Sequence, residues 1–166
     1  MGRRVFVVLL VVATLGVVAT VAGASHGGFH ATLMGYDEVP AVSSTGTGEF
    51  GATLTMTREG PAIRYRLDYS GLEGVAMASH IHFGQEDVNG GIVAFLCGGD
   101  GTPACPPSGS VSGLIHADDI IGPAGQGIAA GEFDESVAAM EAGMSYVNVH
   151  TDKHPGGEIR GQVVPD

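Results

Sequence analysis

The residues with the clearest chemical potential are two histidines, His80 and His82, separated by a single isoleucine. In a β-strand, side chains two positions apart point to the same side, so both imidazoles would share one face. Their Cα atoms would lie about 7 Å apart, and at this spacing two imidazoles can converge on one metal ion. The pair therefore predicts a strand that presents two metal ligands on one side.

A third histidine, His150, ends the apolar segment 146–150, and His154 follows four positions later in an expected turn. If this segment pairs with the strand of His80 and His82, or faces it, those two residues and His150 form a three-imidazole cluster, with His154 as a further candidate ligand. Such a ligand set suits Cu(II) or Zn(II). Hydrogen bonds to buried carboxylates or carbonyls could instead hold the histidines without any metal. Cleavage of the chain after Gly23 would also place His26 third from a new amino terminus, where an X-X-His tripeptide can bind Cu(II).

Glu158 and Arg160 alternate with Ile159 near the C-terminus and would share one strand face with Gln162. Because Arg does not exchange protons at ordinary pH, we expect a buried Glu158–Arg160 pair to act as a structural polar network rather than as an acid–base pair. The motifs of phosphate-binding loops, of serine hydrolases and of zinc proteases are absent from the sequence. We therefore predict no catalytic residue.

The N-terminus has the three parts of an export signal. Two arginines precede the apolar residues 5–21, and Ala22-Gly23-Ala24 supplies the small residues at which cleavage occurs. We expect residues 1–24 to be a signal peptide, with an uncleaved anchor as the alternative, because 17 apolar positions can just span a bilayer. Residues 25–166 would form one domain, secreted or otherwise extracytoplasmic, that touches a membrane only through residues 5–21 if these are retained.

The charge and the cysteines agree with such a location. Residues 25–166 keep all 18 acidic side chains and five of the seven basic ones, so their formal charge is 5 − 18 = −13. This charge disfavours nucleic acid and anionic lipid as partners, although acidity can also serve solubility alone. Cys97 and Cys105 lie in one Gly/Pro-rich loop, which in an exported chain predicts a disulfide.

Short segments separated by turn residues predict an all-β fold. The clearest is 62–69, where Ile63, Tyr65 and Leu67 alternate with charged residues. One helix is expected, capped by Asp134 and stopped by Gly143. We expect an antiparallel Greek-key, immunoglobulin-like β-sandwich with one short helix and about eight strands: 29–36, 48–57, 62–69, 79–83, 92–96, 109–115, 146–150 and 158–164.

Several blocks, in this order, resemble the CHRD domain, the module named after chordin. The blocks are Phe29-His30-Ala31-Thr32-Leu33, Glu38-Val39-Pro40, Leu67-Asp68-Tyr69-Ser70-Gly71-Leu72, Ala78-Ser79-His80-Ile81-His82-Phe83-Gly84, Asn89-Gly90-Gly91-Ile92-Val93, Tyr146-Val147-Asn148-Val149-His150-Thr151 and Pro155-Gly156-Gly157-Glu158-Ile159-Arg160-Gly161-Gln162. The resemblance implies an immunoglobulin-like sandwich in an exported, bacterial-type protein. It implies no established enzymatic activity, and the growth-factor binding of chordin does not carry over to a stand-alone domain.

Three functions are compatible with these observations. The first is a non-enzymatic extracytoplasmic binding or structural module that holds Cu or Zn at His80, His82 and His150. The second is a metal-dependent oxidoreductase, because the His-x-His-x-Phe-Gly run is similar to the copper-ligand strand of copper/zinc superoxide dismutases. The third is an envelope-associated adhesion or protein-interaction domain with structural histidines. The expected partner is accordingly a metal ion or an unidentified extracytoplasmic protein.

Overall fold

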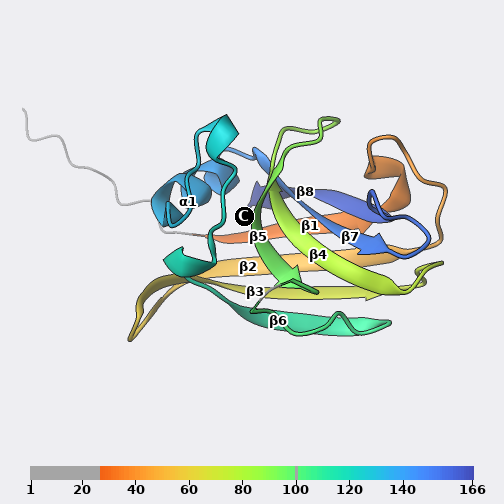
Figure 1. Cartoon of the computed structure of the whole chain (residues 1–166), viewed down its shortest axis with the longest axis horizontal. Coiled ribbons are helices and arrows are strands. Elements are labelled where there is room, and N and C mark those ends of the chain that lie inside the picture. Colours follow the sequence, from red (N-terminus) through yellow and green to blue (C-terminus); the bar gives the residue numbers. More distant parts are fainter. Residues whose placement is uncertain (1–26, 100) are drawn as a thin grey trace, which may run out of the picture.

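The computed structural model describes residues 27–99 and 101–166, which form a mostly antiparallel β structure (Figure 1). The predicted signal segment 1–24 lies outside the described residues. The eight strands are β1 (Gly28–Met34), β2 (Thr47–Thr57), β3 (Gly60–Ser70), β4 (Ala76–Phe83), β5 (Gly91–Cys97), β6 (Gly109–Ile115), β7 (Ser145–Thr151) and β8 (Ile159–Pro165). The predicted strands are confirmed, with bounds that agree within three residues.

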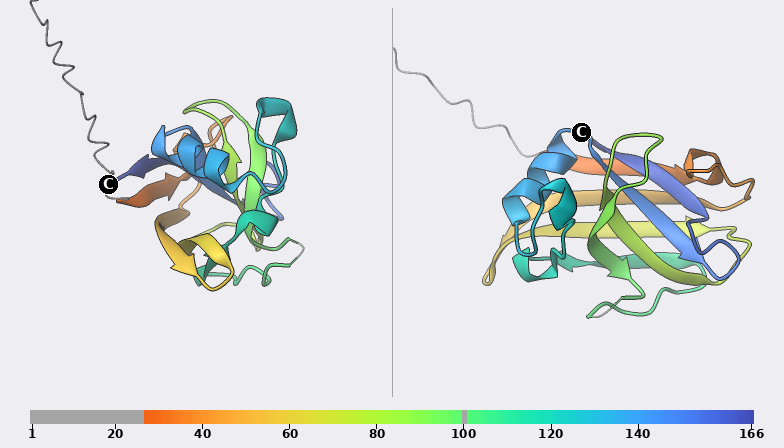
Figure 2. Two further views of the ribbon diagram at one scale, coloured as in Figure 1. Left: turned by 90° about the vertical axis from the view of Figure 1, so that its left-hand side faces the viewer. Right: turned by 45° about the horizontal axis from the view of Figure 1, so that its top comes forward.

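All eight strands belong to one strongly curved sheet with the order β5-β4-β7-β8-β1-β2-β3-β6. The β1–β8 seam joins two halves through three residue pairs, whereas β1 and β2 pair at seven positions. The chain crosses between the halves after β3, β5 and β6, and Figure 2 shows the halves facing each other as two layers. The fold is thus mostly antiparallel β, a nearly closed barrel-like sheet that is compatible with the expected all-β sandwich.

Alternating apolar side chains fill the space between the layers. In β3, Ile63, Leu67 and Tyr69 are buried while Arg64 and Arg66 are exposed, as a period of two requires. Buried residues on β4 and β7, among them Ile81 and Val147, close the core from the opposite side. Cys97 and Cys105 form the expected disulfide, which fixes the loop between β5 and β6.

The helix α1 (Phe133–Glu141) lies at one end of the barrel. Glu132, not Asp134, occupies its N-cap position, so the predicted cap was wrong, and Asp134 lies in the first turn. The helix begins earlier because Phe133 and Val137 share the buried stripe. The predicted stop is confirmed, since Gly143 follows the C-cap with a φ of 68°. Among the described residues, no helix is long and apolar enough to cross a membrane.

Candidate metal centre

His80 and His82 lie on the outer face of the sheet, opposite Ser79 and Ile81, which point into the core. Strand β4 pairs with β7, and the register places Asn148 opposite His80 and Tyr146 opposite His82. His150 lies two residues beyond Asn148 on the same face of β7. Of the two arrangements that would form the cluster, pairing or facing, the strands adopt pairing, and this brings the three histidines together.

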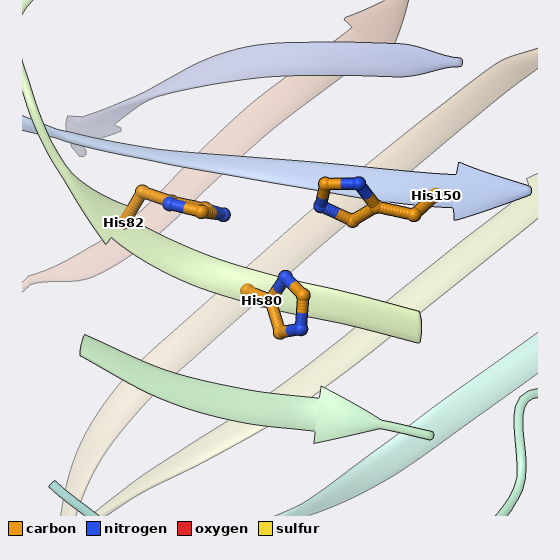
Figure 3. Close-up of side chains that lie close together, drawn as sticks. All are labelled: His80, His82 and His150. Carbon is orange, nitrogen blue, oxygen red and sulfur yellow. The ribbon is translucent and has the colours of Figure 1, made fainter. Parts of the chain in front are cut away.

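The three imidazoles point toward a common space, as Figure 3 shows. Their ring centroids are 4.8 Å apart for His80 and His150, 5.3 Å for His80 and His82, and 6.2 Å for His82 and His150. One nitrogen from each ring lies within 4.8 Å of the other two. Bonds of about 2 Å to one ion would place ligand nitrogens about 3.4 Å apart, so a small contraction would complete the site.

Hydrogen bonds determine which nitrogen of two of the rings is free. His82 Nδ1 lies 3.0 Å from the Gly90 carbonyl oxygen, and His150 Nδ1 lies 2.9 Å from the Pro155 carbonyl oxygen. A carbonyl only accepts, so each Nδ1 donates its proton and each Nε2 carries a lone pair. Both Nε2 atoms are buried without a partner, and so is His80 Nδ1. This pattern is typical of metal-binding histidines oriented by carbonyl groups.

The cluster favours neutral imidazoles. Burial lowers the pKa of His80 to about 3, with His150 and His82 adding to the effect. Burial also lowers the pKa of His82 to about 4, although the Gly90 carbonyl opposes the shift. The pKa of His150 is lowered by burial as well. Since only the neutral ring binds a metal, the three imidazoles are in the metal-binding protonation state at neutral pH.

Aromatic rings enclose the cluster. Phe95, which pairs with His80 in register, presents its ring edge-on at 4.5 Å. Tyr146 stacks on His82 at 4.6 Å with an interplanar angle of 2°. The Tyr146 hydroxyl accepts from the Gly90 backbone N–H, and His82 donates to the Gly90 carbonyl, so the backbone of one residue orients both rings of the stack.

A polar network continues from the cluster under the loops that cover this face. Arg160 donates to the Gln85 and Val88 carbonyls and to Asn89 Oδ1, and it thereby holds the β4–β5 loop. Burial raises the pKa of Glu38 to about 7, against the opposing effects of Arg160 and of hydrogen bonds with Val39 and Asn148.

Glu158 belongs to a separate network. Its carboxylate accepts hydrogen bonds from Ser44, Thr151 and two backbone N–H groups in residues 73–74. Glu158 and Arg160 are both buried in structural networks, but the expected pair between them is replaced by these two independent sets of partners. The reason is position, because Glu158 precedes the regular pairing of β8 and points toward other loops.

The sequence predicted the three cluster histidines but not their surroundings. His154 is not part of the three-histidine group, although its Nε2 atom is also buried without a partner. Tyr146 and Asn148 could have been found from their spacing to His150, because all three share one face of a strand. Glu38 and Phe95 carry no such signal, since only the folded chain brings their loop and strand to the site.

In the described residues, the fold and this cluster define an all-β domain with a three-histidine site on the outer face of its sheet. A family model described as the CHRD domain matches residues 29–163. The chain therefore belongs to the CHRD domain family, as its motifs predicted. Neither curated proteins nor solved structures gave a significant match.

Proposed function

We propose that this chain is an exported, non-enzymatic CHRD-domain protein that binds one Cu or Zn ion through His80 Nδ1, His82 Nε2 and His150 Nε2. The observation that carries the proposal is the convergence of three buried imidazole nitrogens that form no hydrogen bond of regular geometry, with only the Asn148 side chain close enough to His82 to affect its pKa in this way. Buried polar atoms in native proteins nearly always have partners, so three orphans around one space favour an absent ligand. Imidazole donors select Cu or Zn over Mg or Ca.

The extracytoplasmic location is part of the same proposal. The N-terminal signal motif and the Cys97–Cys105 disulfide support it, because disulfides persist in oxidising compartments. The formal charge of −13 on residues 25–166 disfavours nucleic acid as a partner and raises the local concentration of cations.

The test is a titration of the purified protein with Zn(II) and Cu(II), followed by calorimetry and metal analysis. We expect one ion per chain, and at least a hundredfold weaker binding after joint replacement His80→Ala and His82→Ala. The exposed His30, which bonds to Asp166, supplies the matched control His30→Ala. A His26→Ala background removes any terminal copper site. Unchanged stoichiometric binding by the double variant would contradict the assignment.

A second candidate is an oxidoreductase of the superoxide dismutase type, favoured by the His-x-His pair on the outer face of a sandwich. This activity requires an open coordination position at the metal. It predicts that the copper-loaded protein removes superoxide faster than the same concentration of free Cu(II). Equal rates would leave the binding module as the function.

If chelators leave the melting temperature of metal-treated protein unchanged, an adhesion domain with structural histidines becomes the better explanation.

A further inference from the structure

Arg160 places a full positive charge near His82, and the Tyr146 ring contacts both residues. Its side chain is only 2% exposed, and its guanidinium lies 3.5 Å from the centroid of the Tyr146 ring. The Tyr146 ring also stacks in parallel on His82 at 4.6 Å. The guanidinium, the phenol ring and the imidazole are therefore in consecutive contact, and the imidazole ends in the free Nε2.

The position of this charge is fixed. Three hydrogen bonds of 3.0–3.3 Å hold the guanidinium to the β4–β5 loop. Because the groups lie under covering loops, water screens the charge less than it would at the surface.

A bound Cu(II) ion places one more unit of positive charge at the histidine cluster than a bound Cu(I) ion does. Resting on the metal site proposed above, we propose that Arg160 is a positioning residue whose buried charge, acting across Tyr146 and His82, favours Cu(I) over Cu(II). Glu38 carries the opposite charge, interacts electrostatically with Arg160, and limits this effect when it is ionised. The same charge disfavours Zn(II) as it disfavours Cu(II), because both ions carry two positive charges.

The decisive measurement is the reduction potential of the copper-loaded protein, together with separate Cu(I) and Cu(II) affinities from competition with chelators. In Arg160→Gln, we expect the ratio of Cu(II) to Cu(I) affinity to rise about tenfold, which lowers the potential by about 59 mV for one electron. Arg160→Lys keeps the charge but loses the planar fork, so its potential should stay near that of the wild type. Glu38→Gln at pH 8 should shift the potential upward.

Three outcomes separate the explanations. A merely structural Arg160 would weaken both copper affinities together, leave the ratio unchanged and make Lys as damaging as Gln; this result would overturn the inference while the metal site stands. Absence of copper binding by the wild-type chain would overturn the inference about Arg160, and absence of both copper and zinc binding would overturn the proposed metal site as well. Arg64→Gln, an exposed arginine on the outer face of the other half of the sheet, removes the same charge and should leave the potential unchanged.

Discussion

At the scale of single residues, the site depends on keeping three imidazoles neutral inside the protein. Burial lowers the pKa values of His80 and His82 to about 3 and about 4, whereas an unfolded histidine titrates near 6.5. Below pH 6.5 the unfolded chain therefore binds protons that the folded chain does not. Stability contributed by this pair is present above pH 6.5 and is lost as the pH falls toward 4.

We expect the metal-free protein to lose on the order of 2 kcal/mol of unfolding free energy per imidazole between pH 7 and pH 4.5. Glu38 acts in the opposite direction, because its raised pKa of about 7 makes its ionisation cost stability as the pH rises above 4.5. Urea denaturation across this range should therefore use a Glu38→Gln background. Joint replacement of His80 and His82 by Asn should flatten the acid dependence, and an unchanged slope would show that these histidines are not buried as described.

At the scale of elements, the β1–β8 seam is the narrowest connection between the two layers. Gly161 of β8 lies against the backbone of Thr32 on β1, and a methyl group at this glycine would overlap the Thr32 carbonyl. The close approach allows the two layers to meet and keeps β8, which carries Arg160, beside β7. Packing between the strands therefore requires a glycine at position 161, the last residue of the Gly-Glu-Ile-Arg-Gly block.

Gly161→Ala should destabilise the protein by about 1–3 kcal/mol, the usual cost of overpacking. Gly51→Ala is the matched control, because Gly51 also lies in a strand but a methyl group there meets nothing within 4 Å. Urea midpoints of the two variants provide the comparison. Equal midpoints would mean that the seam adjusts freely and does not limit how the layers pack.

At the scale of the whole molecule, the proposed ligand would couple two strands and the turn after β7. His80 and His82 belong to β4, His150 belongs to β7, and Pro155 orients His150 from the turn. An ion bound only by the native state stabilises the fold by mass action, by about 2.7 kcal/mol at one hundred times the dissociation constant. Metal binding should therefore stabilise both strands and the turn together, as part of one unfolding transition.

We expect saturating Zn(II) or Cu(II) to raise the melting temperature by several degrees, and a chelator to reverse the increase. The variant that lacks both His80 and His82 should show no such increase, while His30→Ala should respond like the wild type. Differential scanning calorimetry measures the shift. A similar increase in the double variant would indicate metal binding elsewhere on the acidic surface.

The sequence by itself determined the strands, the disulfide and the three histidines, because alternation of apolar residues and the spacing of ligands are local properties of the chain. His80 and His82 share a face in any β-strand, and Ile63, Leu67 and Tyr69 must be buried together. Only the tertiary structure decided that β4 lies beside β7, which nitrogen of His82 and His150 is free, and that Arg160 bonds to the β4–β5 loop instead of Glu158. These features depend on strand register and on loops distant in sequence, and no local pattern encodes them.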